Sequence, residues 1–136
     1  IIRSHVRDEF VTPQPVIDTK KILEARKLVK KVYVDERIEQ YIADIVFASR
    51  YPEQYKLQNI KDYIAFGGSP RASINLALAG RANAFIKRRG YVVPEDIRDV
   101  AHDVLRHRIG LTYEAEAMNV SADDLINEIL NKVEVP

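Results

Sequence analysis

The apolar residues of this chain recur every three to four positions in five segments, which is the spacing of one face of an α-helix. The predicted helices span about residues 18–30, 36–50, 70–89, 94–109 and 122–132. Their apolar positions are Ile22, Ala25 and Val29; Ile38, Tyr41, Ile42, Ile45 and Val46; Ile74, Leu78 and Phe85; Ile97, Val100, Ala101, Val104, Leu105 and Ile109; and Leu125, Ile129 and Leu130. The sequence therefore predicts a mostly α fold, a small bundle of four to five helices.

Residues that favour the start of a helix stand before each segment. They are Asp18 or Thr19, Asp35, Ser69, and Ser121 with Asp124, the last pair resembling a capping box. Pro70 and Pro94 occupy first helical positions, where the missing amide hydrogen costs nothing. These signals predict where the helices begin more sharply than the apolar pattern does.

The segments between the helices carry weaker signals. Residues 32–34 and 91–93 are short β-favouring runs, which can pair as a minimal two-stranded ribbon. Residues 51–68 predict a long irregular connection with a short helical turn around 59–65, and the piece after Gly110 predicts extended chain. Residues 1–17 predict an extended lead-in, so the expected helical domain is 18–136.

The stretch from Gly67 to Gly90 combines two unusual features. Arg71 lies in the first turn of its predicted helix, where the macrodipole disfavours a cation, so we expect it to face an anion such as a phosphate. Gly80 lies in the interior of the same helix, where glycine costs about 1 kcal/mol relative to alanine. A close approach of another helix would offset that cost.

Composition excludes several classes of protein. The chain has 136 residues, a formal net charge of +1 and no cysteine, which argues against a general affinity for nucleic acid and against disulfides or thiolate metal sites. No apolar run approaches the roughly 20 residues of a membrane span, and no signal peptide is recognisable. The first residue is not methionine, so we expect an excised domain or, as the alternative, a natural fragment.

The motifs of nucleotide chemistry are missing from the sequence. It contains neither a G-x-x-x-x-G-K-[ST] phosphate loop nor a G-x-G-x-x-G fingerprint, and Gly67 to Arg71 do not form a G-x-S-x-G elbow. His102 and His107 lie five residues apart, which is not the spacing of a helical metal site, so hydrogen-bonded or exposed histidines are expected. No metal site is predicted.

Two basic clusters end predicted helices. One comprises Arg81 with residues 87–89, and the other is residues 106–108. Positive charge stabilises a helix C-terminus, which is the simpler interpretation. A patch for an acidic partner or a neighbouring subunit is the alternative.

The string GGSPRAS, with the later YVVPEDIRDVAHDVLRHRIGL, resembles the C-terminal lid of MoxR-type AAA+ ATPases. The resemblance continues through VYVDERIEQYIADIVFASR upstream and TYEAEA downstream, and covers about residues 13–136. It implies a helical lid that packs over a nucleotide held by an α/β core. Gly68 departs from the alanine that the family more often has at that position.

The resemblance also implies a role for the residues at the start of the third long helix. Arg71 would be the sensor 2 arginine, reaching the γ-phosphate of ATP, and Gly67, Gly68, Ser69 and Pro70 would lie against the nucleotide. ATP and magnesium would be the cofactors of the full-length protein. Its partners would be its own AAA+ core, neighbouring subunits of a ring, typically a hexamer, and a von Willebrand factor A domain protein, in the cytoplasm.

The Walker A and B segments, sensor 1 and the arginine finger are not in this sequence. The chain alone should therefore not hydrolyse ATP, although the full-length protein would. A free-standing helical adaptor that binds protein through its basic helix ends is the alternative from another class. A helical DNA-binding domain is a third interpretation, which the near-zero net charge disfavours.

Overall fold

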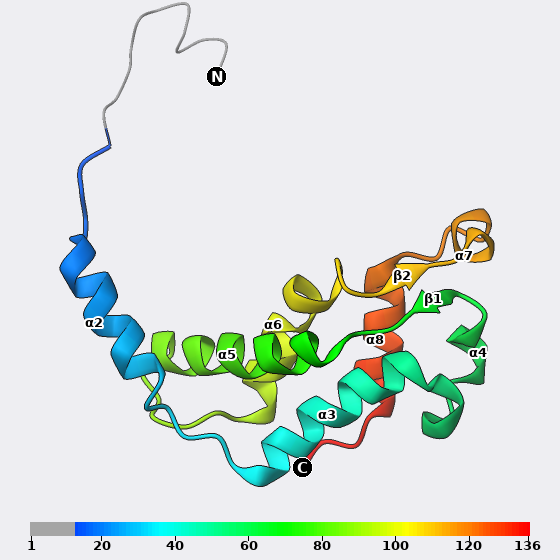
Figure 1. Ribbon diagram of the computed structural model, residues 1–136, viewed down its shortest axis with the longest axis horizontal. Coiled ribbons are helices and arrows are strands. Elements are labelled where there is room, and N and C mark those ends of the chain that lie inside the picture. Colours follow the sequence, from blue (N-terminus) through cyan, green and yellow to red (C-terminus); the bar gives the residue numbers. More distant parts are fainter. Residues whose placement is uncertain (1–12) are drawn as a thin grey trace, which may run out of the picture.

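The structure is a computed structural model of the chain, and it describes residues 13–136. These residues form seven α-helices, one 3₁₀ helix and two short strands (Figure 1). In chain order they are α2 (Thr19–Val29), α3 (Glu36–Arg50), η1 (Pro52–Tyr55), α4 (Gln58–Lys61), β1 (Ile64–Phe66), α5 (Pro70–Ile86), α6 (Pro94–Leu105), β2 (Gly110–Leu111), α7 (Tyr113–Ala117) and α8 (Ala122–Lys132). The mostly α fold predicted from the sequence is confirmed, and the five predicted helices correspond to α2, α3, α5, α6 and α8.

The hydrophobic core lies among α3, α5, α6 and α8. Its fully buried side chains include Ile45, Leu76, Ile97, Leu105, Leu125 and Ile129. Helix α5 contributes its small-residue face, because its buried residues are Ala72, Leu76, Gly80 and Ala84. The expected stripe on this helix was wrong at two of its three positions: Ile74 and Leu78 are 58% and 48% exposed, whereas Phe85 packs against the core.

Gly80 explains why the small face is the buried one. A Cβ atom at Gly80 would lie 2.5 Å from Cδ1 of Ile97 on α6, closer than real Cβ contacts occur. The two helices therefore approach more closely than an alanine would allow in this arrangement. The close helix contact expected at Gly80 is confirmed.

The helix starts follow the sequence signals, whereas two helix ends differ. Asp35 accepts a hydrogen bond from the amide of Arg37, and Ser121 and Asp124 form the expected reciprocal capping box. Helix α5 ends at Ile86 rather than near residue 89, where Arg88 adopts a positive φ of 60°. Helix α6 ends at Leu105 rather than near Ile109, because the chain turns there and the amide of Arg108 donates to the carbonyl of Leu105.

The predicted ribbon is reduced to a single bridge. Tyr33 and Tyr91 are paired in parallel, with the amide of Tyr33 donating to Gly90 and that of Val92 to Tyr33. The antiparallel two-stranded sheet lies elsewhere, between β1 and β2, in segments that the sequence predicted as irregular or extended.

The segments predicted as irregular are more ordered than expected. Residues 51–68 contain η1, α4 and β1, and α7 interrupts the piece expected to be extended. Pro52, Leu57, Ile60 and Ala115 are buried and hold these short elements against the bundle. These buried residues are too few and too scattered to make a periodic pattern that could be recognised in the sequence.

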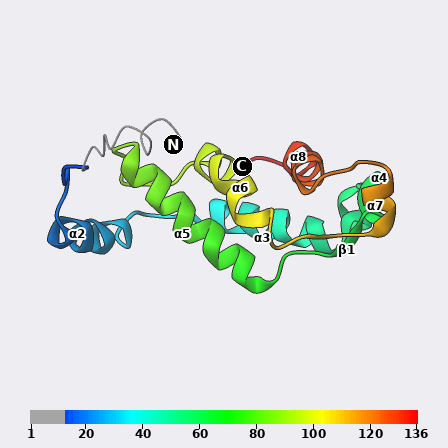
Figure 2. The same ribbon diagram turned by 90° about the horizontal axis from the view of Figure 1, so that it is seen from above.

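Helix α2 lies at one end of the molecule and α7 at the other (Figures 1 and 2). Helix α2 has no buried residue, although it lies near the C-terminal part of α5. Of the expected lead-in, residues 1–12 lie outside the described part of the chain, and residues 13–17 are exposed without helix or strand. Within residues 13–136, no helix is both long and apolar enough to cross a membrane.

Candidate functional site: the start of helix α5

The loop of Gly67, Gly68 and Ser69 joins β1 to α5 and is fixed to the C-terminal end of α3. The amide of Gly68 donates to Oγ of Ser49 at 2.9 Å, and that hydroxyl donates to the carbonyl of Val46 at 2.6 Å. Ser49 is fully buried. The buried hydroxyl thus both donates and accepts a hydrogen bond, and these two bonds tie the loop to α3.

Close packing explains the two glycines of this loop. A Cβ atom at Gly67 would lie 2.3 Å from the carbonyl oxygen of Ser49, so only glycine fits against this backbone. A Cβ atom at Gly68 would lie 3.2 Å from Cβ of Ala72, a tight contact that a small shift could relieve. Neither glycine has a positive φ. Their proposed approach to a nucleotide stays a prediction, and their packing against α3 and α5 is sufficient to explain them.

Ser69 and Pro70 begin α5. Ser69 occupies the N-cap position with extended backbone angles, and Pro70 follows at the first helical position. The hydroxyl of Ser69 makes no capping hydrogen bond, so the expected cap is present in backbone geometry only.

Arg71 lies exposed in the first turn of α5. Within residues 13–136 its side chain makes no hydrogen bond or ion pair. The neighbouring positions on the same helix face are the exposed Ile74 and Leu78. A cation and two large apolar side chains therefore point away from the core along one edge of α5.

A hollow of about 330 Å³ lies beside this loop, between the end of α3 and the start of α5. It is lined by Val46, Phe47, Arg50, Tyr51, Pro70 and Ser73. The rings of Phe47 and Tyr51 are stacked with centroids 6.1 Å apart, and both side chains are partly exposed. The volume is at the lower end of the range of small-ligand pockets.

Arg50 links the hollow to the loop. Its guanidinium lies 5.9 Å from the ring centroid of Tyr51, and Nη1 donates to the carbonyl of Gly68 at 3.4 Å. The sequence analysis found the α5 side of this site and missed the α3 side. The available signal was that Phe47 and Tyr51, spaced by four residues, lie off the predicted core stripe of α3.

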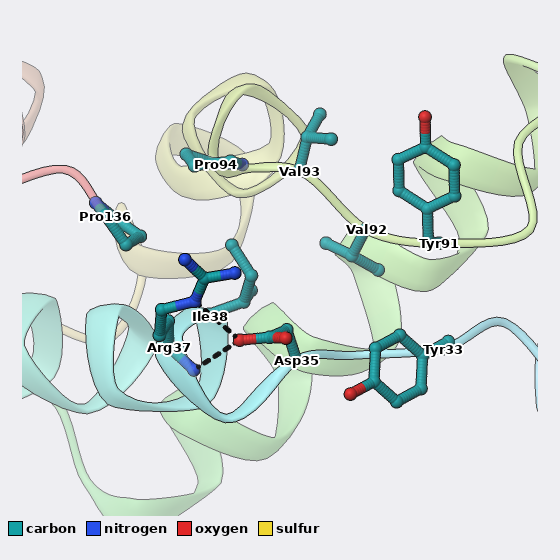
Figure 3. Close-up of a pocket in the computed structure, with 9 residues that line it drawn as sticks. All are labelled: Tyr33, Asp35, Arg37, Ile38, Tyr91, Val92, Val93, Pro94 and Pro136. Carbon is teal, nitrogen blue, oxygen red and sulfur yellow. Dashed lines mark hydrogen bonds and ion pairs between the residues drawn. The ribbon is translucent and has the colours of Figure 1, made fainter.

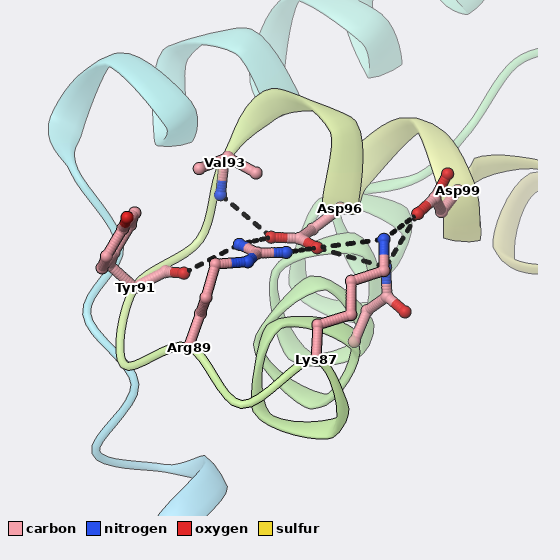
Figure 4. Close-up of polar contacts among 7 residues, drawn as sticks. Lys87, Arg89, Tyr91, Val93, Asp96 and Asp99 are labelled. Carbon is pink, nitrogen blue, oxygen red and sulfur yellow. Dashed lines mark hydrogen bonds and ion pairs between the residues drawn. The ribbon is translucent and has the colours of Figure 1, made fainter.

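After the C-terminal end of α5 two basic residues are paired with carboxylates, unlike Arg71 at its start (Figure 4). Arg89 binds the fully buried carboxylate of Asp96 with two hydrogen bonds of 2.6 Å, and Lys87 pairs with Asp99. Burial alone would raise the pKa of Asp96, but the bonds from Arg89 and from the Val93 amide outweigh it and lower the pKa. These two basic residues are therefore paired within the domain.

One residue of the second basic cluster and one histidine also have partners within the domain, whereas the buried Nε of Arg108 has none among the described residues. Arg106 pairs with Asp123 at 2.8 Å, which joins the end of α6 to the start of α8. His102 Nε2 lies 3.0 Å from Oδ1 of Asn127, a hydrogen bond of the kind expected. Among residues 13–136 no group of three or more histidine or acidic side chains is arranged to hold a metal ion.

A second hollow, of about 320 Å³, lies at the Tyr33–Tyr91 bridge (Figure 3). Its polar contact is the pair of Asp35 and Arg37, in which the side-chain bond from Arg37 lowers the pKa of Asp35. Asp35 is also the cap of α3. None of the residues that line this hollow was predicted from the sequence to act in catalysis, nucleotide binding or metal binding.

Comparison with known proteins assigns the fold to a family. A family model described as AAA lid domain matches residues 57–129. The chain is 38% identical over 129 residues to Chaperone MoxR1 of Mycobacterium tuberculosis, covering 93% of this chain and 34% of that protein. It is 34% identical over 125 residues to the uncharacterized protein YeaC of Bacillus subtilis, covering 92% of this chain and 36% of that protein.

A solved structure has the same architecture. It is the crystal structure of a protein described as an ATPase, from Cytophaga hutchinsonii, with a TM-score of 0.90 and 42% identity. The match covers 99% of this chain and 41% of that one. This chain thus spans about a third of the length of its curated relatives and two fifths of the solved one.

The chain therefore belongs to the AAA lid domain family. Its relatives place it more particularly with the lids of MoxR-type AAA+ ATPases. The resemblance seen in the sequence is confirmed at this level.

Proposed function

We propose that this lid closes over ATP held by an AAA+ core and that Arg71 contacts the phosphates as the sensor 2 residue. The observation that carries the proposal is an exposed arginine in the first turn of α5, without a partner in residues 13–136, beside a ligand-sized hollow. A cation in this turn is unfavourable unless an anion approaches it. An ATP phosphate is such an anion, and arginine can bind it in a bidentate manner.

The hollow beside Arg71 suits the other half of a nucleotide. Its stacked rings of Phe47 and Tyr51, with aliphatic Val46 and Pro70, offer a flat apolar surface to a purine base. The hollow and Arg71 adjoin the same end of α5. One ligand with an aromatic base and an anionic tail can therefore contact both.

The remaining features of the proposal rest on the resemblance to the family. The core would hold the phosphates and magnesium, and closure of the lid would couple hydrolysis to movements within a ring, typically of six subunits. A cytoplasmic chaperone function beside a von Willebrand factor A domain partner is part of the same proposal. The chain itself would not be an ATPase without the core.

The test is Arg71→Ala in the full-length ATPase. Loss of a charge that acts in the transition state should lower ATP turnover more than tenfold. Arg37→Ala is the control, because Arg37 is an exposed arginine whose pair with Asp35 contributes little. Turnover equal to that of the control would exclude the proposed role of Arg71.

A second substitution tests the base site separately. Phe47→Ala should raise the KM for ATP several-fold with a smaller change in kcat, because stacking on the base contributes to binding in both the ground and transition states. An unchanged KM would remove the hollow from the proposal and leave the role of Arg71 intact.

The adaptor alternative is less well supported by the contacts of the described residues. It requires basic helix ends that are available to a partner, yet Lys87, Arg89 and Arg106 are paired with Asp99, Asp96 and Asp123. The same pairing weakens the interpretation as a DNA-binding domain, which would use these cations on phosphates.

A further inference from the structure

The hollow at the Tyr33–Tyr91 bridge, which we call the tyrosine hollow, plays no part in the function proposed above. Its volume is about 320 Å³, and it lies at the end of α3 opposite to the hollow beside Arg71. Arg37 lines one hollow and Arg50 the other, about 20 Å apart along the helix axis. A ligand of the tyrosine hollow is therefore a different one from the nucleotide.

Two exposed tyrosines form one side of this hollow. Tyr33 and Tyr91 are bridge partners, and they are 61% and 55% exposed. Figure 3 shows both rings on one side of the hollow and Pro136 on the other. The nearly buried Ile38 and Val92 also line it. Exposed aromatic rings beside aliphatic side chains are typical of grooves that bind extended peptide segments.

The hydrogen-bond acceptors beside the rings are already used within the domain. They are the carbonyls of Tyr33, Tyr91 and Val93 and Oδ1 of Asp35, which accept respectively from the Val92 amide, from Nη1 of Arg89, from the Asp96 amide, and from both the amide and Nε of Arg37. A ligand therefore gains little by presenting N–H groups to this surface.

Hydrogen-bond donors remain on the same surface. Within residues 13–136 the hydroxyls of Tyr33 and Tyr91 make no hydrogen bond, and the side chain of Arg37 bonds only through Nε. That side chain is 79% exposed, so Nη1 and Nη2 can bind a carboxylate in a bidentate manner. The tyrosine hollow thus suits a ligand with several acceptors, few donors and a negative charge.

An extended segment that contains proline has this chemistry. Proline has no amide hydrogen, and a polyproline II segment makes no internal hydrogen bonds, so its carbonyls can accept bonds from a partner. The chain itself gives an example at this place. Val133 leaves α8 with φ −67° and ψ 129°, close to polyproline II, and Pro136 of the same tail lines the hollow. A proline ring is thus already accommodated against this surface.

We propose that the tyrosine hollow binds an extended, proline-containing segment of a partner protein, in which an acidic residue accompanies the prolines. The proline rings pack on Tyr33 and Tyr91, and the two hydroxyls donate to carbonyls of the segment. Nη1 and Nη2 of Arg37 bind the carboxylate. The surface is small, so the contact is weak by itself and suits a transient partner.

Fluorescence anisotropy with a labelled peptide tests the binding. The probe is a fluorescein-labelled peptide of repeats of two prolines and one glutamate, mixed with this chain at concentrations up to about 1 mM, where weak complexes form. We expect saturable binding. The same peptide with alanine in place of proline regains the amide hydrogens and keeps the charge, and it should bind at least about five-fold more weakly. Glutamine in place of glutamate should also weaken binding and remove most of its dependence on salt.

Substitutions in the chain place the peptide on this surface. Tyr33→Ala and Tyr91→Ala should each raise the Kd at least about five-fold, because each removes a ring that the prolines contact. Tyr33→Phe/Tyr91→Phe keeps both rings and should bind more tightly than either alanine variant. Tyr113→Ala is the matched control, since Tyr113 of α7 is 87% exposed and lies outside the hollow. It should bind the peptide like the unaltered chain, and circular dichroism should show the same helix content for all variants.

Three results would overturn the proposal. The first is an anisotropy that stays constant up to the highest concentration of the chain. The second is equal binding of the proline and alanine peptides, which would mean that charge alone attracts them. The third is equal binding by the alanine variants of Tyr33, Tyr91 and Tyr113, which would place the peptide elsewhere on the domain. Nucleotide and Arg71 take no part in the measurement, so its failure leaves the proposed ATPase role untouched.

Discussion

At its C-terminal end, helix α5 passes into a turn whose Lys87 and Arg89 are both paired with aspartates of α6, whereas at its N-terminal end Arg71 has no such partner among residues 13–136. The apolar residues divide by helix face instead. Ala72, Leu76, Gly80 and Ala84 are buried along the length of α5, and Ile74, Leu78 and Ile86 are exposed. The difference between the two ends of α5 therefore lies in their cations, which are paired with aspartates after the C-terminal end and available to a ligand or a partner at the start.

The largest effect on stability is expected where the pairing is tightest. Asp96→Ala should lower the free energy of unfolding by about 3 kcal/mol, because it leaves Arg89 without its partner and removes the acceptor of the Val93 amide. We expect the low end of the loss in unfolding free energy that is typical when a buried ion pair is broken, because the side chain of Arg89 is 25% exposed. Urea unfolding followed by circular dichroism measures the change.

Asp103→Ala provides the control for that loss. Asp103 is an exposed aspartate of the same helix, and its contact with Arg106 is a surface pair. The change should stay within about 0.5 kcal/mol. Equal losses for the two variants would show that the pair of Asp96 and Arg89 has no special weight in the fold.

A smaller effect is expected from acid. The pKa of Asp96 is lower in the folded protein than its ordinary value near 3.9 in the unfolded chain. Its contribution is therefore complete above about pH 5 and is lost as the pH falls below 4 towards the folded pKa, because the unfolded state binds the proton first. Urea midpoints measured between neutral and acid pH should fall less steeply for Asp96→Ala than for the unaltered chain. If the urea midpoints of the variant and of the unaltered chain fell in parallel with pH, Asp96 would not be the source of this acid sensitivity.

The smallest effect is expected at the start of α5. Arg71→Ala should change the free energy of unfolding of this chain by less than about 0.5 kcal/mol, because the side chain is exposed and contacts no partner in the described residues. The same urea assay measures it beside Arg89→Ala, which should be clearly destabilising. A large loss at Arg71 would mean that this arginine holds the fold, and the contrast between the two ends of α5 would disappear.

The sequence predicted the long helices well because their signals are local. Asp35 and Asp124 form capping hydrogen bonds with residues no more than three positions away in the sequence. The apolar stripes of α3 and α6 repeat over several helical turns. The short elements were missed because each depends on distant contacts. Strand β2 exists only by pairing with β1, where Gly110 lies against the ring of Phe66.

The candidate site was half predictable for the same reason. Arg71 stands out in the sequence because its charge conflicts with its position in the helix. Phe47 and Tyr51 carry no such conflict, and only the folded chain places them beside Pro70. The exposed face of α5 was predicted wrongly, since hydrophobicity favours burying Ile74 and Leu78 over Gly80. The close contact with Ile97 reverses that preference.

The contact of Gly67 with the carbonyl of Ser49 has a mechanical consequence. The loop cannot move away from the end of α3 without breaking the bond between Gly68 and Ser49, and it cannot move closer, because its backbone already touches that of Ser49. The start of α5 is therefore fixed to the C-terminal end of the fifteen-residue α3. A displacement of about 1 Å at the start of α5 would tilt α3, whose length is about 22 Å. The segment that joins α2 to the other end of α3 would then move with it.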